Sequence, residues 1–455
     1  MKGKRIYLGV DVGGTKVQAS LFTEEGEQLG RQRCPTPREG GSEEVLAAVE
    51  RAMQDVLADR GLSHGDLTAA GVAVPGVVEP DQGYVVVTPN MNLTGVPLGD
   101  HLKRRFDVPI AIGNDCNLGA LGEAWLGAAR QAESVVAILV GTGIGGGFVH
   151  AGNLWRGARE AAGEIGHIVM QIGGPKCGCN NLGCLEALAS RTAIERDIRQ
   201  AVAAGRESVI TELVEGDLSV IRSGMLRRAL EADDAVVGEV LRHASEVIGH
   251  ACLTVRHLID PEVIVLGGGV VEACSDFMLP IVERVVTSDR LPGAREGGRV
   301  LRSALGDDAV VIGAVALARN TIGRSPFKRQ FAETPKSPKI EEVAFGRITI
   351  GKNTYDHDVC IRATGKVKKR KKALAKQRYG SSHTIGVEEI ERLCKGAPEL
   401  VIVGTGMSSG AQLHDNARRF LEQRAIECQV LPTREAVEAY NRSPKRKAIL
   451  VHLTC

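Results

Sequence analysis

A strand, a glycine-rich turn and a second strand follow one another at two places in this chain. The first copy is RIYLGVDVGGTKVQASLF, and the second, about 130 residues further on, is SVVAILVGTGIGGGFVHAGNLW. Apolar runs on both sides of a short turn predict a β-hairpin at each place. This weak internal repeat predicts two similar lobes, each of which presents one glycine turn.

Strands and helices alternate through the rest of this region. An acidic first turn and a glycine stop mark a helix in SEEVLAAVERAMQDVLADRG, and VPIAIGNDCNLGALGEAWLGA runs from strand into helix. PEVIVLGGGVVEAC then predicts a buried strand that leads into three consecutive glycines and a helix. The region is therefore predicted to be α/β, with three glycine turns that could converge on one ligand.

Length and charge predict a second module. The 455 residues exceed what one hydrophobic core usually supports. Residues 339–455 hold 22 Lys and Arg against 13 Asp and Glu, a balance of +9, whereas residues 1–338 hold 35 against 42, a balance of −7. The segment RSPFKRQFAETPKSPK has three prolines and no periodicity. We therefore predict a first module over 1–323, a linker over 324–338 and a second module over 339–455.

The first two glycine turns carry groups that suit a nucleotide. Backbone N–H groups in such turns approach an anion closely, although a single glycine turn is often only a tight turn. Neither turn fits the P-loop pattern, and neither opens a helix as the Rossmann fingerprint does. The turn DVGGTK offers a carboxylate for a metal ion, two glycines, a hydroxyl and a cation: Asp11, Gly13, Gly14, Thr15 and Lys16.

A phosphotransferase also needs a base near the attacking hydroxyl, and Asp115 is the candidate. It lies in IGNDCN, at the end of an apolar strand and the start of a helix, where a carboxylate can point into a pocket. The alternative is that Asn114 or Asp115 only caps the helix.

Three of the eleven cysteines fall within eight residues, and His167 lies ten residues before the first of them. The remaining eight are scattered singly, which is not a disulfide framework. The spacing H-x9-C-x-C-x4-C is not a usual zinc-finger arrangement, but it supplies a closed set for a tetrahedral, structural Zn²⁺. A redox dithiol and unligated thiols are the alternatives. The candidate ligands are His167, Cys177, Cys179 and Cys184.

Six segments in order make the first module resemble the ROK family of sugar kinases, within the actin-like, hexokinase and Hsp70 ATPase superfamily. They are DVGGTK, GVAVPGVVEP, GNDCNLGALGEAWLGA, VGTGIGGGFVHAGNLWRGARE, GEIGH and KCGCNNLGCLEALAS, and the resemblance covers roughly residues 4–323. It implies a two-lobed actin-like fold with ribonuclease H-like lobes. The small lobe would cover about 1–118 plus the C-terminal helix, and the large lobe about 119–306.

The resemblance also implies a role for each motif. DVGGTK would hold the phosphates and Mg²⁺ of ATP, Asp115 would be the general base, and the cysteine motif is the family's zinc signature. The second phosphate element would be Gly141, Thr142 and Gly143, and the turn beside the adenosine would be Gly267, Gly268 and Gly269. The implied sugar ligands are Asn90, Asn114, Asp115, Glu164, His167 and Glu186.

Together these residues predict an ATP-dependent hexose kinase that converts glucose to glucose 6-phosphate. The stretch TPNMNLTGVPL has Thr94 and Gly95 where family glucokinases usually carry Gly-Trp, which removes one sugar-facing cue. An N-acetylmannosamine kinase, a fructokinase and a non-catalytic sugar sensor with the second module as its output are the alternatives. Repressors of the family carry an N-terminal helix-turn-helix, for which the first strand, at about residue 5, is expected to leave no room.

The second module resembles the small α/β Mth938-like family through FGRI, YDHDV, VIVGTGMSSG and PTREAVEAYN, which implies a fold but no function. The turn GTGMSSG, residues 404–410, is predicted to lie between a strand and a helix, where it would bind an anion or only cap the helix. The run KVKKRKK, residues 366–372, lacks interleaved aromatic residues. We therefore expect a solvated loop there and no nucleic-acid partner.

No signal peptide and no membrane span are indicated. We therefore expect a cytoplasmic protein without a membrane partner, whose ligands are a hexose and ATP. The family usually forms dimers or tetramers, so the resemblance implies a homodimer or a homotetramer.

Overall fold

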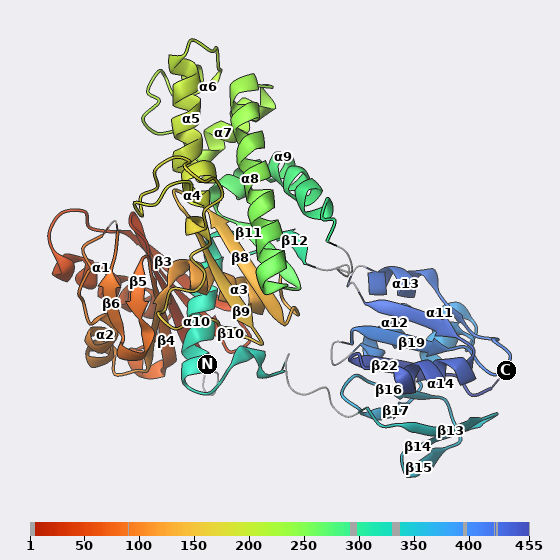
Figure 1. The fold of residues 1–455 in the computed structure, drawn as a ribbon. Coiled ribbons are helices and arrows are strands. Elements are labelled where there is room, and N and C mark those ends of the chain that lie inside the picture. The colour runs from red at the N-terminus through yellow and green to blue at the C-terminus, as the bar shows by residue number, and fades with distance from the viewer. Residues whose placement is uncertain are drawn as a thin grey trace. The chain divides into compact units, whose positions relative to one another are not determined.

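Two five-stranded sheets with the same strand order form the centre of the first unit (Figure 1). Each has a three-stranded antiparallel part that two parallel strands extend. The first runs β3 (Gln28–Pro35), β2 (Lys16–Thr23), β1 (Ile6–Val12), β4 (Leu67–Val74), β7 (Ile110–Asn114). The second runs β10 (Asn153–Leu154), β9 (Ile144–His150), β8 (Ser134–Val140), β11 (Val263–Gly267), β12 (Arg299–Arg302). The predicted two-lobed α/β fold is confirmed, since the sequence repeat is a repeat of whole sheets.

The structure is a computed structural model that describes residues 5–89, 91–291, 298–329, 337–394, 398–422, 424 and 426–454. It contains two compact units, Met1–Phe331 and Ala332–Cys455. Part of the predicted linker, residues 330–336, lies outside the described residues, so its bounds stay a prediction. Among the described residues, no helix combines the length and the apolar character that crossing a membrane requires.

Helices cover both faces of each sheet in the first unit (Figure 1). α1 (Ser42–Ala58) and α2 (Leu98–Phe106) pack on one face of the first sheet, beside the small hairpin of β5 (Val77–Glu79) and β6 (Tyr84–Val87). α3 (Asp115–Trp125) and α10 (Ala309–Thr321) form a shared core with both sheets. The outer face of the second sheet carries α4 (Leu185–Ala189), α5 (Arg191–Ala203), α6 (Ile210–Leu213), α7 (Ser223–Glu231), α8 (Ala235–Ile259) and α9 (Gly269–Thr287).

The two central helices touch through glycine. A Cβ atom at Gly313 of α10 would lie 1.7 Å from the carbonyl oxygen of Leu118 of α3. A Cβ atom at Gly122 of α3 would lie 2.1 Å from the carbonyl oxygen of Ala309. Side chains at these two positions would push the helices apart, so the glycines set how closely the two lobes approach.

The second unit has its own sheet, in the order β17 (Val367–Lys369), β16 (Val359–Ile361), β22 (Lys447–Val451), β19 (Leu400–Gly404), β21 (Glu427–Leu431). α14 (Thr433–Arg442) packs on one face, and α12 (Val387–Leu393) and α13 (Asp415–Glu422) pack on the other. The smaller elements are β13 (Ile340–Ala344), β14 (Arg347–Ile350), β15 (Asn353–Tyr355), α11 (Lys372–Tyr379), β18 (Thr384–Ile385) and β20 (Gln412–Leu413). The predicted small α/β domain is therefore confirmed.

Two expectations for the second unit are wrong. The run 366–372 is not a solvated loop, because it contains β17 and because the side chain of Arg370 is fully buried in ion pairs with Asp358 and Glu389. The glycine turn 404–410 does not lead directly into a helix, because β20 precedes the start of α13 at Asp415. Both differences come from pairing with distant segments, which local patterns do not record.

A buried carboxylate ties the end of α3 to the segment after β12. Glu123 is fully buried, and its Oε1 accepts hydrogen bonds from Ser303 Oγ at 2.6 Å and from the Leu305 N–H at 2.9 Å. Its Oε2 accepts from the Ala128 N–H at 2.8 Å, and the Ala304 N–H also donates to this carboxylate. The sequence pattern gave no sign of this role, since Glu123 lies in an otherwise apolar helix.

Replacing this carboxylate should destabilise the first unit. Glu123→Ala leaves several buried N–H groups unpaired, so the free energy of unfolding should fall by about 2–4 kcal/mol. Urea unfolding followed by tryptophan fluorescence measures this, because both tryptophans, Trp125 and Trp155, lie in the first unit. The exposed Glu133→Ala is the control, with a change within about 0.5 kcal/mol. Equal effects of the two substitutions would contradict the anchoring role.

Candidate active site and metal centre

The first glycine turn joins β1 to β2 and is tied to the rest of the chain at both ends. The Gly13 N–H donates to the Lys16 carbonyl at 2.9 Å, and Thr36 Oγ1 donates to the Gly13 carbonyl at 2.6 Å. Lys16 Nζ donates to Asp307 Oδ2 at 2.8 Å, although 291 positions separate the two residues. Asp307 lies just before α10, so the turn is connected to the start of that central helix. Gly14 and Thr15 complete the turn between the two strands.

The second glycine turn, between β8 and β9, is braced by the start of α5. The Gly141 N–H donates to the Gly143 carbonyl at 2.9 Å, which closes the turn. Arg191 Nη2 donates to Thr142 Oγ1 at 2.7 Å, and Thr192 Oγ1 donates to the Thr142 carbonyl at 2.8 Å. Sequence reasoning missed Arg191, because its link to Thr142 spans 49 positions.

The third glycine turn lies against the second. Gly268 is the N-cap of α9 with φ +85°, and a Cβ atom there would lie 2.6 Å from the carbonyl oxygen of Val140, the residue before the second turn. Gly267, the last residue of β11, pairs with Leu139 of β8. On its other side, α9 begins at Gly269 and contains Glu272. Burial and then the charge of Asp307 raise the pKa of Glu272, so Asp307 lies near the third turn as well as the first.

Sequence analysis left open whether Asn114 or Asp115 only caps the helix, and the structure shows which of the two is the cap. Asn114 is the N-cap of α3, since its Oδ1 accepts from the Asn117 N–H at 3.0 Å, and its Nδ2 donates to the Gly76 carbonyl at 3.0 Å. Asp115 is the first residue of the helix, and its Oδ1 accepts from the Cys116 N–H at 2.8 Å. The helix is therefore capped by Asn114, which leaves the side chain of Asp115 for another role.

The carboxyl groups of Asp11 and Asp115 both have raised pKa values. Burial and then the negative charge of Asp115 raise the pKa of Asp11 to about 7, and Lys16 acts in the opposite direction. Burial also raises the pKa of Asp115, while hydrogen bonds from Cys116 lower it. Burial raises the pKa of the Cys116 thiol, with further contributions from Asp115, Glu164 and Asp11. The charges of three predicted site carboxylates therefore act on one thiol.

A cavity of about 600 Å³ lies between the lobes, which is a volume typical of small-molecule sites. Asn114 and Glu164 line it, and so does Asn117, which sequence reasoning missed. Asn117 Oδ1 is buried and accepts no hydrogen bond from the described residues. The sequence does contain a signal for Asn117, because it lies three residues after Asn114 at the start of a helix, and residues three apart lie on the same face of a helix. Asn90 lies outside the described residues, so its predicted contact with the sugar stays a prediction.

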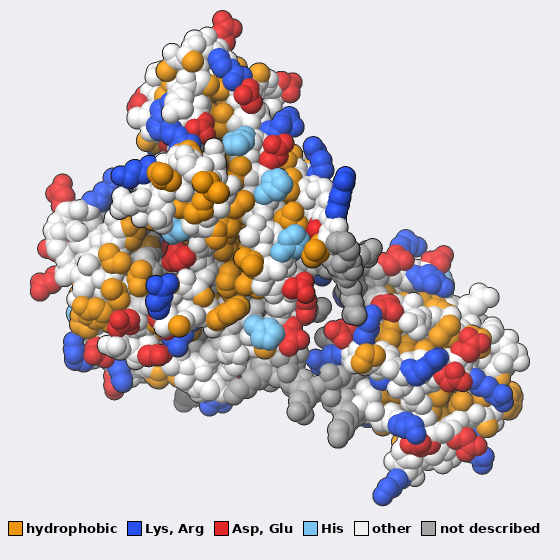
Figure 2. Space-filling view, viewed as in Figure 1, with side chains coloured by type: hydrophobic (Ala, Val, Ile, Leu, Met, Phe, Trp, Pro, Cys, Tyr) orange, Lys and Arg blue, Asp and Glu red, His pale blue; other side chains and the backbone are white. Residues whose placement is uncertain are grey.

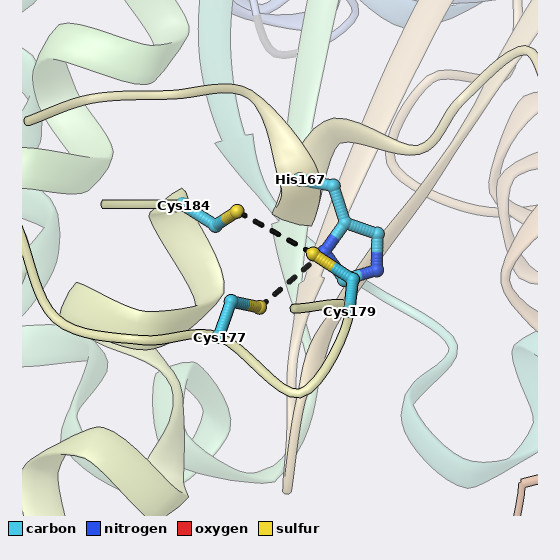
Figure 3. Close-up of side chains that lie close together, drawn as sticks. All are labelled: His167, Cys177, Cys179 and Cys184. Carbon is cyan, nitrogen blue, oxygen red and sulfur yellow. Dashed lines mark hydrogen bonds between the residues drawn. The ribbon is translucent and has the colours of Figure 1, made fainter. Parts of the chain in front are cut away.

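The four predicted metal ligands lie together (Figure 3). Their ligand atoms are all within 4.8 Å of one another; Cys179 Sγ lies 3.7 Å from Cys184 Sγ, and Cys177 Sγ lies 3.6 Å from His167 Nδ1. Tetrahedral Zn²⁺ would hold two sulfurs about 3.8 Å apart and a sulfur and a nitrogen about 3.6 Å apart. The four residues thus fit this ion in chemistry and in spacing.

The three thiols of this cluster differ in acidity. Burial raises the pKa of Cys177 to about 12 and also raises the pKa of Cys184. The Asn181 backbone N–H, with help from the other two thiols, lowers the pKa of Cys179. Cys179 is therefore the cysteine of the cluster that ionises most readily, and the thiolate is the form that ligates metals.

Two carboxylates connect the metal cluster to its surroundings. Glu186 Oε2 accepts from the Ile144 N–H of the second glycine turn at 2.9 Å, and its Oε1 accepts from Cys177 Sγ at 3.5 Å. Glu164 Oε2 lies 3.9 Å from His167 Nε2. One nitrogen of His167 thus faces the cysteines and the other faces Glu164, which lines the cavity between the lobes.

Two family models match the sequence. Residues 7–321 match the ROK family, which is most of the chain. Residues 340–449 match a family described as "Protein of unknown function (DUF498/DUF598)".

Individual relatives match the first unit. A glucokinase of Halalkalibacterium halodurans is 35% identical over 310 residues, which cover 68% of this chain and 93% of the relative. The crystal structure of a ROK family glucokinase from Streptomyces griseus in complex with glucose and AMPPNP has 30% identity and a TM-score of 0.60, covering 70% of this chain and 100% of that one. An N-acetylglucosamine repressor of Escherichia coli O6:H1 is 29% identical and covers 69% of this chain and 75% of the repressor.

The raised pKa of Asp11 predicts a stability change that depends on pH. The Asp11 carboxyl group holds its proton more tightly in the folded chain than in the unfolded chain. The free energy of unfolding therefore falls as the pH rises from about 4 through 7. Asp11→Asn removes this penalty, so in the absence of ATP and Mg²⁺ it should stabilise the chain at pH 8. The pKa of about 7 sets an upper limit of about 4 kcal/mol on this gain. The gain should be smaller than this limit because Asp11 keeps some contact with solvent.

Urea unfolding at pH 5 and pH 8 measures this change. The gain in stability at pH 5 should be the smaller one, because less of the penalty has developed there. Asp100→Asn, at an exposed position on α2, is the control and should show no gain at either pH. A gain that is the same at both pH values would show that the charge on Asp11 is not its cause.

Proposed function

The chain belongs to the ROK family, and we propose that this ATP-dependent sugar kinase transfers the γ-phosphoryl group of ATP to O6 of glucose, with Asp115 as general base. The observation that carries this proposal is the position of Asp115. It begins α3 with its side chain free of the capping role, and it lies close enough to Asp11 for its charge to raise the pKa of Asp11. The predicted membership of the second unit in the Mth938-like family is also confirmed.

The glycine turns would bind the phosphates of ATP. Their backbone N–H groups and Lys16 are the groups for the charged oxygens, and Asp11 is the carboxylate for the Mg²⁺ that accompanies ATP. Lys16 is paired with Asp307 through side chains that are 40% and 64% exposed. An exposed pair of this kind contributes little to stability, so Lys16 can move to a phosphate at low cost. The turn 267–269, beside the second turn, would take the adenosine.

Asp115 would take the proton of the attacking hydroxyl. The O6–H bond breaks as O6 forms a bond to the γ-phosphorus, the bond to the departing ADP breaks, and the proton stays on the Asp115 carboxylate. A raised pKa makes this carboxylate the stronger base, because its proton affinity lies nearer to that of the developing alkoxide. The Cys116 N–H bonded to Oδ1 at 2.8 Å holds the carboxylate in place during transfer.

The sugar would lie in the cavity between the lobes, against its lining residues Asn114 and Glu164. His167, whose Nε2 lies 3.9 Å from Glu164 Oε2, and Glu186 would be further ligands, although neither is among the residues that line this cavity. Both ends of the Asn114 amide are bonded within the protein, so it would orient Asp115 and offer the sugar its remaining lone pair and N–H. Glucose is favoured as the acceptor because the glucokinases among the relatives match the first unit over nearly their whole length.

A structural zinc would orient the sugar ligands. His167 would hold the ion through Nδ1, and its ring would then present Nε2 toward Glu164, which lines the cavity. A zinc-bound Cys177 thiolate has no proton to donate, so Glu186 Oε1 would be released for a sugar hydroxyl while Oε2 remains on Ile144.

The assignment of Asp115 predicts a loss of turnover with little loss of binding. Asp115→Asn keeps the shape of the side chain but cannot accept the proton, so kcat for glucose should fall by about 100-fold or more while the Kd for ATP changes less than threefold. A coupled ADP-release assay with glucose, N-acetylmannosamine and fructose measures this, with Asp100→Asn as control. Near-normal turnover of Asp115→Asn would show that another group is the base.

The metal cluster predicts one zinc per chain. Cys179→Ser removes the most acidic ligand, so elemental analysis should find much less zinc, the melting temperature should fall by several degrees and KM for glucose should rise. Cys34→Ser, outside the cluster, is the control for the loss of a thiol. Full activity and unchanged melting of a zinc-free preparation would contradict the structural role.

A further inference from the structure

The second unit contains a cavity of its own, with a volume of about 270 Å³. It lies where the hairpin of β16 and β17 faces α12, and it is lined by side chains from all three elements. Three members of the basic run 366–372, which the proposed function does not use, lie on its wall. The cationic lining residues are Arg362, Lys368, Lys369, Lys371 and Arg392.

None of these five cations is paired with a carboxylate within the part of the chain that the structure describes. Glu389 is the one carboxylate of the lining, and it is paired with Arg370. It accepts hydrogen bonds from Arg370 Nε at 2.9 Å and from Arg370 Nη2 at 3.1 Å. Arg370 is fully buried, so it neutralises Glu389 without reaching the cavity itself. The walls therefore carry about five uncompensated positive charges.

The rest of the lining adds no negative charge. Leu393 is buried, and burial raises the pKa of Cys360 to about 12, so its thiol is neutral. An apolar floor lowers the local dielectric constant and strengthens the field of the cations above it. The whole second module has a balance of +9. Figure 2 shows Lys and Arg side chains spread over the face of this unit that is turned to the viewer.

The buried ion pairs hold the basic run in place. Asp358 Oδ2 accepts from Arg370 Nη1 at 3.3 Å and lies 3.1 Å from Lys372 Nζ, and the Arg370 N–H donates to the Asp358 carbonyl at 2.9 Å. Lys369 and Lys371, on either side of Arg370, are exposed and line the cavity. The backbone that carries the cations is therefore fixed by the fold before any ligand arrives, which lowers the entropic cost of binding.

We propose that this cavity binds a small metabolite through its phosphate groups. Arg and Lys side chains together match a group with two or more negative charges, and the guanidinium groups of Arg362 and Arg392 suit phosphate geometry. The volume fits a compact metabolite rather than a large ligand. Among the residues that the structure describes, no aromatic side chain lines the cavity, so these residues do not offer the stacking that single-stranded nucleic acids use.

Amide hydrogen exchange of the full chain tests the proposal. Pyrophosphate and glucose 6-phosphate are the phosphate probes, succinate is the carboxylate probe, and a single-stranded oligonucleotide is the polymer probe. The phosphate probes should slow exchange in peptides that cover residues 359–371 and 387–394. These peptides lie in the second unit, so the readout does not depend on whether the first unit phosphorylates glucose.

Matched variants separate the cavity from general positive charge. The triple variant with Lys368→Gln, Lys369→Gln and Arg392→Gln should lower the affinity for pyrophosphate. The pyrophosphate concentration that gives half of the maximal protection should rise at least about tenfold. Combined Lys352→Gln, Lys376→Gln and Arg434→Gln removes three exposed cations of the same unit that do not line the cavity, and it should change the affinity less than twofold. Three outcomes would overturn the proposal: no protection by either phosphate probe, equal weakening by both sets of variants, or protection by succinate or the oligonucleotide that matches that by phosphate.

Discussion

The contact between α3 and α10 determines where the site is built. Gly122 and Gly313 let the two helices approach until a Cβ atom would collide with the opposite backbone, so the distance between the two lobes depends on the absence of two side chains. α3 begins at Asp115 and α10 begins directly after Asp307 and Asp308. Packing the helices together therefore also brings the proposed base and the partner of Lys16 close enough to Asp11 for the charges of both to raise its pKa.

Two partly buried carboxylates, those of Asp11 and Asp115, lower the stability of the fold. Burial raises the pKa values of both Asp11 and Asp115, so the folded chain holds two carboxylates that would ionise more easily in water. In contrast, Glu123 is fully buried but accepts hydrogen bonds from four donors, and it serves as an anchor. The two cases differ in their hydrogen-bond donors: four fixed donors match the charge of Glu123, whereas the Oδ1 of Asp115 accepts from the Cys116 N–H alone among the hydrogen bonds described above.

The second unit repeats this division between buried and exposed charge. Asp358, Arg370, Glu389 and His452 form a buried network in which His452 Nδ1 lies 2.5 Å from Asp358 Oδ2. Leaving any member unpaired would be costly, so the network fixes the path of the chain around Arg370. Lys372 pairs with Asp358 as well, whereas Lys368, Lys369 and Lys371 have no partner of opposite charge among the described residues. A run that looks uniform in sequence thus has two members held by Asp358 and several that are available to a ligand.

The sequence by itself determined most of the elements and the two modules, and it predicted the site residues. Hairpins, glycine turns and the start of α3 are local, because each depends on the periodicity and backbone freedom of a few adjacent residues. The cysteine cluster was also readable, since its ligands lie within 18 positions of one another. Only the tertiary structure decided that Asp307 pairs with Lys16, that Asn114 and not Asp115 caps α3, that Asn117 lines the cavity and that Arg370 is buried. These contacts, apart from the cap, join segments far apart in the chain, and their geometry exists only after the sheets and helices have packed.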